Sequence, residues 1–187
     1  MSEVRCSVYI AASVDGFIAR SDGDVRWLER PEYATEESYG LSYGEYIATV
    51  DALVMGRHTF ETVLTFAEWP YEGVPVVVLT RRGLRIPDSL EGKVRVDGGA
   101  PVEVIRRLAE RGARHLYIDG GATIRGFLRA DLIDEITVTW IPVLLGAGIS
   151  LFGGLGVERD LVHLETHTAG NGFVQSRYRI GSGPRAF

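Results

Sequence analysis

Cysteine is almost absent from this chain. Cys6 is the only cysteine among the 187 residues, so no disulfide can form within the chain. It lies in an apolar stretch that favours a strand, where a single thiol behaves as a small core residue rather than as a nucleophile. The sequence therefore excludes a fold that is held together by internal disulfides.

Long apolar runs and an excess of basic residues are also missing. No window reaches the roughly 18 apolar residues that a membrane-spanning helix needs, and the N-terminus lacks the basic-then-apolar pattern of a secretory signal. The net charge is −5 and the pI is near 5.4, so no overall positive field favours nucleic acid. We expect a cytoplasmic protein that acts on small molecules and binds neither nucleic acid nor membranes.

What the chain does contain is an ordinary globular composition, with 45% hydrophobic and 24% charged residues. Its length predicts one domain, residues 1–187, with a sizeable core. Internal repeats, low-complexity stretches and linkers are not found. One domain is therefore expected to carry the whole function.

Residues 51–63 carry the first functional signal. An apolar run predicts a buried strand, and Gly56, Arg57, His58 and Thr59 follow it at the start of a predicted helix. Gly56 allows close backbone approach, the helix start with Thr59 makes an anion site, and Arg57 adds donors suited to phosphate. A phosphate-bearing ligand is indicated, although an ordinary capped helix with a solvated arginine explains the same residues.

A second turn of the same kind follows the predicted strand over residues 115–119. Residues 120–123, Gly-Gly-Ala-Thr, lead into a predicted helix over residues 124–130. The two turns are expected at the same edge of a parallel sheet, where donors from both sides can hold a pyrophosphate. The pattern is not GxGxxG, so a standard Rossmann domain is not indicated.

The rest of the chain alternates strands and helices and then ends in strands. Helices are predicted over residues 36–50, where a tyrosine stripe recurs at helical spacing, and over residues 101–112. Asn171-Gly172 predicts a hairpin turn. The other predicted strands cover residues 4–12, 74–80, 94–96, 132–143, 161–168 and 174–180. The fold class is therefore α/β, with a mostly parallel central sheet and an antiparallel C-terminal hairpin at its edge.

Two further groups of residues have two interpretations each. Arg81 and Arg82 follow a buried strand, where open α/β sheets bind ligands, but they also suit a solvated loop. His163, Glu165 and His167 share one face of a predicted strand, yet two histidines and one glutamate make a weak metal site. For these three we expect a solvated face and no metal.

Three motifs follow one another along the chain in an order that is typical of one protein family. They are residues 10–19, the first strand and the loop after it; residues 55–61, Met-Gly-Arg-His-Thr-Phe-Glu; and residues 118–124, Ile-Asp-Gly-Gly-Ala-Thr-Ile. Together they resemble the dihydrofolate reductase-like superfamily over nearly the whole chain. Residues 132–135, Leu-Ile-Asp-Glu, and residues 142–148, Pro-Val-Leu-Leu-Gly-Ala-Gly, look closest to its riboflavin-biosynthesis reductase branch. The resemblance implies a three-layer fold and an NADPH-dependent reductase.

The resemblance also implies where the cofactor binds. Arg57 and Arg81 would favour NADPH over NADH by pairing with the 2′-phosphate. Ala12 and Ile18 are implied to flank the nicotinamide. The residues implied for the phosphates are Gly56, Arg57, His58, Thr59, Gly120, Gly121, Ala122 and Thr123, and Asp119 and Ile124 are implied as further cofactor-binding residues beside them. Those implied for the adenosine end are Leu79, Thr80, Arg81 and Arg82.

The implied reaction is hydride transfer from NADPH to a small heterocycle, of the type reduced by 5-amino-6-(5-phosphoribosylamino)uracil reductase. Asp15 is the candidate proton relay, although it also suits a residue that caps its own turn. Asp15, Trp27 and Tyr46 are the candidate substrate contacts, in a cleft bounded by the long, turn-rich loop 13–35. Trp27 alternatively anchors this loop on the core.

Other functions stay open at this point. Dihydrofolate reductase has a single acid on the helix after the first loop, and the spacing here does not choose between Asp15, Glu36, Glu37 and Glu45. The H-x-E and P-C-x-x-C zinc signature of a deaminase is absent. A non-catalytic NADPH-binding module and a structural dimer with a decayed site are the remaining alternatives. We expect a homodimer, in part because the strand within residues 136–143 could end at an exposed sheet edge.

Overall fold

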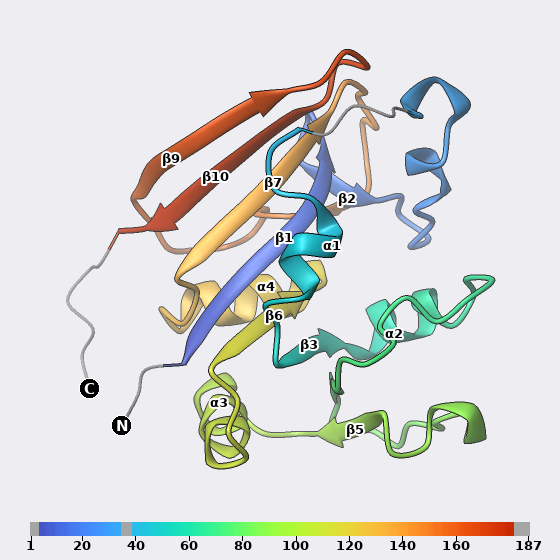
Figure 1. Cartoon of the computed structure of the whole chain (residues 1–187), viewed down its shortest axis with the longest axis vertical. Coiled ribbons are helices and arrows are strands. Elements are labelled where there is room, and N and C mark those ends of the chain that lie inside the picture. Colours follow the sequence, from blue (N-terminus) through green and yellow to red (C-terminus); the bar gives the residue numbers. More distant parts are fainter. Residues whose placement is uncertain (1–3, 35–38, 182–187) are drawn as a thin grey trace.

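An eight-stranded sheet forms the centre of the protein (Figure 1). The structure is a computed structural model that describes residues 4–34 and 39–181. The strands of this sheet are β1 (Arg5–Ser13), β3 (Ala52–Gly56), β4 (Val76–Leu79), β5 (Val94–Asp97), β6 (His115–Asp119), β7 (Glu135–Ile141), β9 (Leu161–Thr168) and β10 (Val174–Ile180). They lie in the order β5-β4-β3-β6-β1-β7-β10-β9. Neighbours from β5 to β7 are parallel, and β10 is antiparallel to both β7 and β9.

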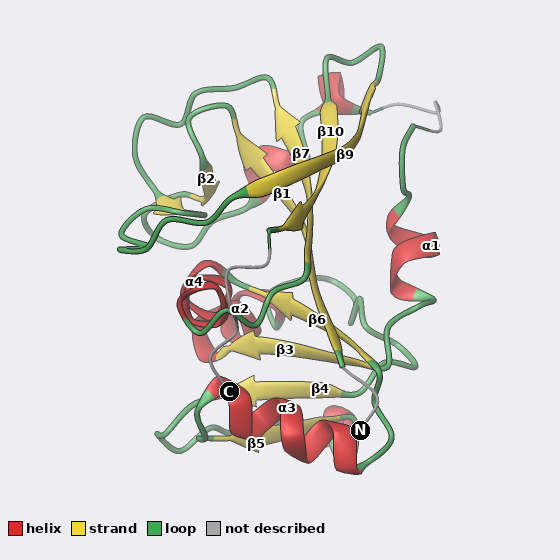
Figure 2. Cartoon of the chain, turned by 90° about the vertical axis from the view of Figure 1, so that its left-hand side faces the viewer, coloured by secondary structure: helices red, strands yellow, loops and turns green. Residues whose placement is uncertain are grey.

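Helices cover both faces of the sheet, which confirms the predicted three-layer α/β fold. Two are α1 (Tyr43–Ile47) and α2 (Arg57–Val63), whose buried side chains join one apolar cluster. The others are α3 (Pro101–Glu110) and α4 (Gly121–Arg129), which pack into the second cluster. Figure 2 shows α1 and α4 on opposite sides of the strands. The apolar run of β3 follows from this arrangement, because Leu53 faces one cluster and Val54 the other.

Shorter elements fill the connections. A small sheet joins β2 (Phe17–Ala19) to β8 (Ile149–Ser150). The 3-10 turns are η1 (Arg26–Leu28), η2 (Pro31–Tyr33) and η3 (Asp88–Leu90). The loop expected over residues 13–35 thus contains β2, η1 and η2, and its strand is tied to the glycine-rich segment 144–152.

The helix predicted over residues 36–50 is wrong in length. Residues 35–38 lie outside the described part of the chain, and α1 begins only at Tyr43. The Ser42 hydroxyl accepts the Glu45 N–H at 3.2 Å, and the Glu45 carboxylate accepts the Ser42 N–H at 3.0 Å. This capping box fixes the helix start. Tyr39 therefore lies outside the helix, where its ring packs edge-on against Phe173.

The antiparallel hairpin lies at the edge of the sheet, as predicted, but β7 differs from the prediction. We predicted a long strand over residues 132–143 that ends at an exposed edge, but β7 is shorter and lies between β1 and β10. The edge of the sheet is β9, where Leu161, Val162 and Leu164 are exposed. The antiparallel hairpin covers β7 because β10 continues the sheet beyond it.

The described residues were compared with what a metal site and a membrane-spanning helix require. Within the described residues, no group of three or more His, Cys, Asp or Glu side chains is placed to hold a metal ion. Glu165 instead pairs with Arg177 at 3.0 Å and with His167 at 3.3 Å. No helix within residues 4–34 or 39–181 has the length and apolar character that a membrane crossing requires.

The two glycine turns meet at the carboxyl edge of the sheet. β3 and β6 are parallel neighbours, with Met55 beside Asp119. A Cβ added to Gly56 would lie 3.0 Å from the Thr123 hydroxyl, and a Cβ added to Gly120 would collide with the Thr59 hydroxyl. Each glycine therefore makes room for the threonine of the other turn, and the starts of α2 and α4 interlock.

These turns lie at a topological switch point. The chain leaves β3 toward α2 on one face and leaves β6 toward α4 on the other. In open α/β sheets, ligands bind in the crevice beyond the strand ends at such a point. The fold therefore places the interlocked turns where a ligand is expected.

The interlock predicts that Gly120→Ala destabilises the protein. Gly120 has a φ of +86° and a ψ of +135°, a conformation that residues with a side chain rarely adopt, and an alanine there costs on the order of 1–3 kcal/mol for the backbone alone, before Thr59 is displaced. We expect a lower urea midpoint than in the wild type.

Gly126→Ala is the matched control within the same helix. A Cβ at Gly126 meets no atom within 4 Å, and alanine in a helix interior is favoured over glycine by about 1 kcal/mol. We expect an unchanged or raised midpoint for this variant. Equal midpoints for Gly120→Ala and the wild type would show that the turn relaxes without cost.

Candidate functional site

The start of α2 presents a guanidinium and backbone N–H groups that no side chain caps. Its N-cap is Gly56, and no side chain caps the helix. Arg57 donates from Nε to Glu61 at 2.6 Å and from Nη1 to the Gly83 carbonyl at 3.2 Å. These contacts hold the guanidinium beside the turn, and Arg57 in return lowers the pKa of the Glu61 carboxyl. The side chain of His58 is 96% exposed. It can therefore contact a ligand only where that ligand extends into solvent.

The start of α4 is enclosed more tightly. Gly120 is its N-cap, again without a side-chain cap. Thr123 and Ile124 are buried, whereas Ala122 is exposed. A Cβ on Gly121 would lie 3.2 Å from both Ile18 and Ile149, which belong to the small sheet. The structure thus brings Ile18, expected at the nicotinamide, against the turn expected at the pyrophosphate.

Ala12 is the second residue expected at the nicotinamide. It is fully buried near the end of β1, opposite Trp140. Its small side chain lets neighbouring groups pack closely against the strand end. The prediction that Ala12 flanks the nicotinamide therefore requires contact through the end of β1, because the side chain of Ala12 is not exposed.

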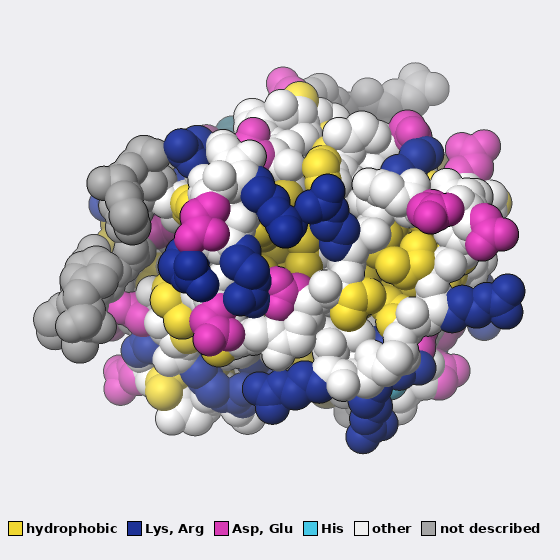
Figure 3. Space-filling model, turned by 90° about the horizontal axis from the view of Figure 1, so that it is seen from below, with side chains coloured by type: hydrophobic (Ala, Val, Ile, Leu, Met, Phe, Trp, Pro, Cys, Tyr) yellow, Lys and Arg dark blue, Asp and Glu magenta, His cyan; other side chains and the backbone are white. Residues whose placement is uncertain are grey.

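An open hollow lies at the ends of β4 and β5. It has a volume of about 190 Å³, and its lining residues are Leu79, Thr80, Arg81, Asp97, Gly98 and Gly99. The first three are those expected at the adenosine end. Figure 3 shows Lys and Arg side chains gathered around a hollowed apolar patch on the side where β5 lies. Arg82 stands just outside the lining, with its N–H donated to the Thr80 hydroxyl at 3.1 Å.

Asp97, Gly98 and Gly99 were missed by the sequence reasoning. The available signal was an Asp-Gly-Gly run directly after a short predicted strand. Only the pairing of β5 with β4, which sets Leu79 opposite Asp97, shows that this run completes the hollow.

Asp15 connects two loops. Its carboxylate accepts the Ser13 hydroxyl at 2.5 Å, the Leu145 N–H at 3.1 Å and the Gly146 N–H at 2.7 Å. The Ser13 hydrogen bond, followed by those from the backbone, lowers the pKa of Asp15. The carboxyl therefore stays ionised near neutral pH, a state that accepts protons but does not supply them. The described contacts assign Asp15 to loop positioning more directly than to proton transfer.

Trp27 and Tyr46, the other expected substrate contacts, are both buried. Trp27 is 2% exposed, and its indole N–H meets no acceptor within the described residues. The Tyr46 hydroxyl shares a 2.9 Å hydrogen bond with the Ser7 hydroxyl, and its ring stacks on Tyr9 at 4.8 Å between centroids. These contacts place Tyr46 in the core, and its substrate role stays a prediction.

The environment of Asp119 raises the pKa of its carboxyl, which the sequence did not predict. Side chains alternate along β6, so Asp119 points to the same face as Tyr117, toward α1 and α2. Its Oδ1 accepts the Gly120 N–H at 2.8 Å. Burial raises the pKa of Asp119 to about 6. A carboxyl with such a pKa can hold a proton close to physiological pH, and burial is not readable from one sequence.

Two tyrosines accompany Asp119 on this face. Burial, with Asp119 nearby, raises the pKa of Tyr43 to about 12, and the same causes raise the pKa of Tyr71. In the part of the chain that the structure describes, neither hydroxyl has a hydrogen-bond partner. Asp119, Tyr43 and Tyr71 thus form a polar group, the Asp119 cluster, with unused hydrogen-bonding capacity.

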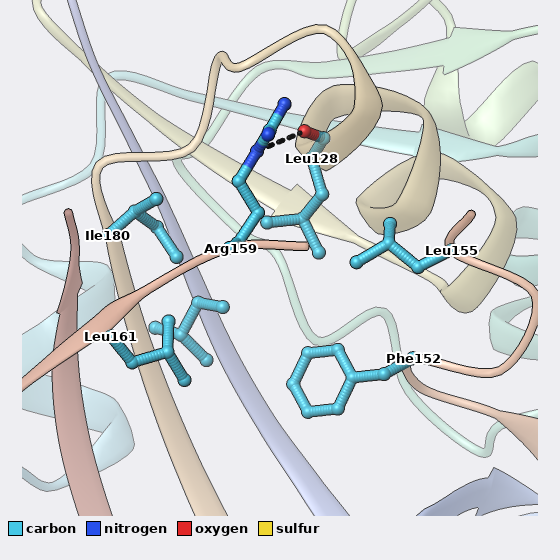
Figure 4. Close-up of a pocket in the computed structure, with 7 residues that line it drawn as sticks. Leu128, Phe152, Leu155, Arg159, Leu161 and Ile180 are labelled. Atoms are coloured by element: carbon cyan, nitrogen blue, oxygen red, sulfur yellow. Dashed lines mark hydrogen bonds between the residues drawn. The ribbon is translucent and has the colours of Figure 1, made fainter. Parts of the chain in front are cut away.

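A second hollow, of about 130 Å³, lies near the opposite end of α4 (Figure 4). Its lining is apolar apart from one arginine and consists of Leu128, Ile136, Phe152, Leu155, Arg159, Leu161 and Ile180. Arg159 donates from Nε to the Leu128 carbonyl at 3.2 Å. With its one charged group turned to the backbone, this hollow offers no converging catalytic groups.

Comparisons with known proteins agree with this geometry. The model of the RibD C-terminal domain family matches residues 6–175. The Bacillus subtilis protein YwjB is 36% identical over 163 residues, which cover 85% of this chain and 88% of YwjB. A crystal structure from Shewanella sp. PV-4, of a protein grouped with riboflavin biosynthesis, superposes with a TM-score of 0.85 at 36% identity and covers 95% of this chain and 99% of that one.

A longer protein shares the fold at low identity. The Thermotoga maritima diaminohydroxyphosphoribosylaminopyrimidine deaminase/5-amino-6-(5-phosphoribosylamino)uracil reductase superposes with a TM-score of 0.70 at 17% identity. The match covers 96% of this chain but 57% of that protein. The match to the family model, the relative of similar length and the shared architecture lead to one conclusion: the chain belongs to the RibD C-terminal domain family.

Proposed function

We propose that this protein is a nicotinamide-dinucleotide-dependent reductase that prefers NADPH and reduces a small heterocycle. The observation that carries the proposal is the pair of interlocked, uncapped helix starts at one switch point. The first-turn N–H groups of α2 and α4 have no side-chain cap, and such groups bind anions. A pyrophosphate placed between them has donors on both sides. Membership of the RibD C-terminal domain family supports reductase chemistry.

The remaining parts of the cofactor follow the edge of the sheet. From the two turns, the hollow at β4 and β5 suits the adenosine, with Arg81 and Arg82 beside it for a 2′-phosphate. In the other direction, Ile18 on β2 lies against Gly121 and suits the nicotinamide. When bound, the cofactor supplies the hydride. The chain binds and orients the cofactor.

The Asp119 cluster suits the substrate side of the same crevice. Gly120 holds Oδ1 of Asp119, which leaves Oδ2 to carry the proton. The hydroxyls of Tyr43 and Tyr71 supply two further hydrogen-bonding groups for a heterocycle. We assign Asp119 as the proton donor and leave Asp15 the role of fixing the two loops.

The substrate proposed is a pyrimidine of the riboflavin pathway, of the 5-amino-6-(5-phosphoribosylamino)uracil type. The Thermotoga maritima protein that shares the fold is named as a reductase of this compound. Dihydrofolate reductase is the weaker alternative, because the carboxylate of Glu45 on α1 is engaged with Ser42. A module that binds NADPH without turnover remains a second alternative, which a turnover assay distinguishes. A cytoplasmic location stays a prediction.

We also propose a homodimer through β9. This strand is the edge of the sheet, with exposed Leu161, Val162 and Leu164. An exposed apolar edge strand is a template for pairing with another chain. The apolar hollow of Figure 4, which includes Leu161, continues this surface. An antiparallel β9–β9 contact would cover both.

Arg57→Ala tests the cofactor site. We expect calorimetry to show NADPH binding by the wild type and affinity weaker by about tenfold or more in the variant, the size of one charge-assisted contact. Arg106→Ala is the control, because Arg106 also pairs at i,i+4, with Glu110, but on the exposed surface of α3. A wild type that binds neither NADPH nor NADH would refute the proposal.

Asp119→Asn tests the proton donor. A donor with a pKa of about 6 is protonated below that pH, so kcat is expected to fall as the pH rises through about 6. The variant should have a lower kcat and no such limb in its pH profile. Asp15→Asn should retain the limb, since the pKa of Asp15 is lowered. The opposite result would return the role to Asp15.

Light scattering tests the dimer. The wild type should have twice the 20.6 kDa mass of one chain, and Val162→Lys with Leu164→Lys should give the monomer through charge repulsion at the edge. Val102→Lys is the control, because Val102 is 61% exposed on α3, away from β9. A monomeric wild type would remove the claim.

A further inference from the structure

The hollow at the ends of β4 and β5 combines charges of both signs. Arg81 lines one side and is exposed, whereas Asp97 lines the other side. β4 and β5 are parallel neighbours, and Leu79 lies opposite Asp97. A basic group alone would suit a phosphate, so the acidic group in the same hollow needs an explanation.

Asp97 is held in place by a residue of α3. Arg107 donates from Nε to Oδ2 at 2.9 Å and from Nη2 to Oδ1 at 2.6 Å. The Gly99 N–H also reaches Oδ1, at 2.8 Å. This two-pronged contact fixes the carboxylate plane. Burial alone would raise the pKa of Asp97, but Arg107 and the Gly99 N–H outweigh it and lower the pKa, so the carboxylate is ionised.

The two glycines after Asp97 keep this part of the hollow free of side chains. A Cβ on Gly98 would lie 3.2 Å from the Thr80 carbonyl, and one on Gly99 would strike the Arg107 guanidinium. Arg81 closes the opposite side through its Nε, which donates to the Gly98 carbonyl at 3.4 Å. A ligand in the hollow therefore meets Asp97, which Arg107 holds in place, together with Arg81.

We propose that the Asp97–Arg107 pair sets the selectivity between NADPH and NADH. This inference rests on the proposed function and assigns a specificity role to two residues of its adenosine end. A carboxylate at this place accepts the 2′-hydroxyl of the NADH ribose and repels the 2′-phosphate of NADPH, whereas arginine favours the phosphate. Arg81 and Arg82 favour NADPH. Asp97 opposes this preference, and Arg107 weakens that opposition because it neutralises part of the charge of Asp97. The protein therefore prefers NADPH only moderately, and NADH also binds.

The two members of the pair act in opposite directions. Asp97→Asn keeps the shape of the side chain, removes the negative charge and releases the Arg107 guanidinium toward a phosphate. Arg107→Gln removes the positive charge and leaves Asp97 uncompensated. The ratio Kd(NADH)/Kd(NADPH) should therefore rise by about tenfold in Asp97→Asn and fall by about tenfold in Arg107→Gln, the size of one charge-assisted contact.

Calorimetry with NADPH and with NADH on the whole chain measures both ratios. The set comprises the wild type, the two single variants and the double variant, whose ratio should return toward that of the wild type. Arg106→Gln is the control, because Arg106 precedes Arg107 on α3 and pairs with Glu110 on the exposed side. Urea midpoints establish that each variant is folded. If Asp97→Asn does not fold, Arg107→Gln still tests the proposal through the sign of its effect.

The outcomes separate this inference from the function on which it rests. A purely structural ion pair would weaken both nucleotides equally in the two variants, and an unmoved ratio would overturn the selector role alone. Ratios that move in the same direction in both variants would overturn it as well. A wild type that binds neither nucleotide would overturn the proposed function, and the selector with it.

Discussion

The reciprocal fit of two threonines into two glycines is the constraint on which this structure depends. Thr59 occupies the space that a side chain at Gly120 would take, and Thr123 does the same at Gly56. The fit brings the starts of α2 and α4 to one point although the helices lie on opposite faces of the sheet. The pairing of β3 with β6 sets the distance between the strand ends, and the two glycines let the helix starts beyond them pack against each other.

From this point the sheet edge divides into three parts. The hollow at β4 and β5 lies on one side, the small sheet of β2 and β8 on the other, and the Asp119 cluster faces α1 and α2. Asp15 links the loops that carry β2 and β8, so these two segments, 130 residues apart in sequence, are held together. A cofactor lying along the edge would contact all three parts.

Local signals in the sequence were sufficient for much of this fold. The apolar runs of β3, β4 and β6 and the glycines after β3 and β6 lie close to where the pattern placed them, because strands buried on both faces leave a clear hydrophobic record. The boundaries of α1 were missed, since the Ser42–Glu45 capping box competed with a tyrosine stripe that continued the helical spacing. The hairpin at the edge of the sheet was predicted, but the position of β7 between β1 and β10 was missed, because strand order depends on pairing between distant segments, which periodicity does not encode.

In the candidate site too, local features could be predicted from the sequence, whereas features that depend on burial or strand pairing could not. The glycines and Arg57 could be read from their spacing, whereas the pKa of Asp119 and the share of Asp97 in the hollow arise from burial and strand pairing. Trp27 and Tyr46 were chosen by residue type, and the structure gave them buried surroundings. Residue type and spacing thus located the two uncapped helix starts better than the surroundings of the side chains that were chosen as substrate contacts.

Asp119 and Gly120 are consecutive residues with different tasks: the acid faces the proposed substrate, and the glycine begins the helix that faces the cofactor. Their Cα atoms are separated by one peptide unit, about 3.8 Å, so neither ligand can be repositioned on this strand without moving the other. A change of substrate is least disruptive at Tyr43, which is 37% exposed and belongs to another segment of the chain, whereas Tyr71 is buried in the core. The distance between the proposed proton donor and the cofactor-binding turn is thus fixed by the backbone, whereas side chains on other segments can change without altering that distance.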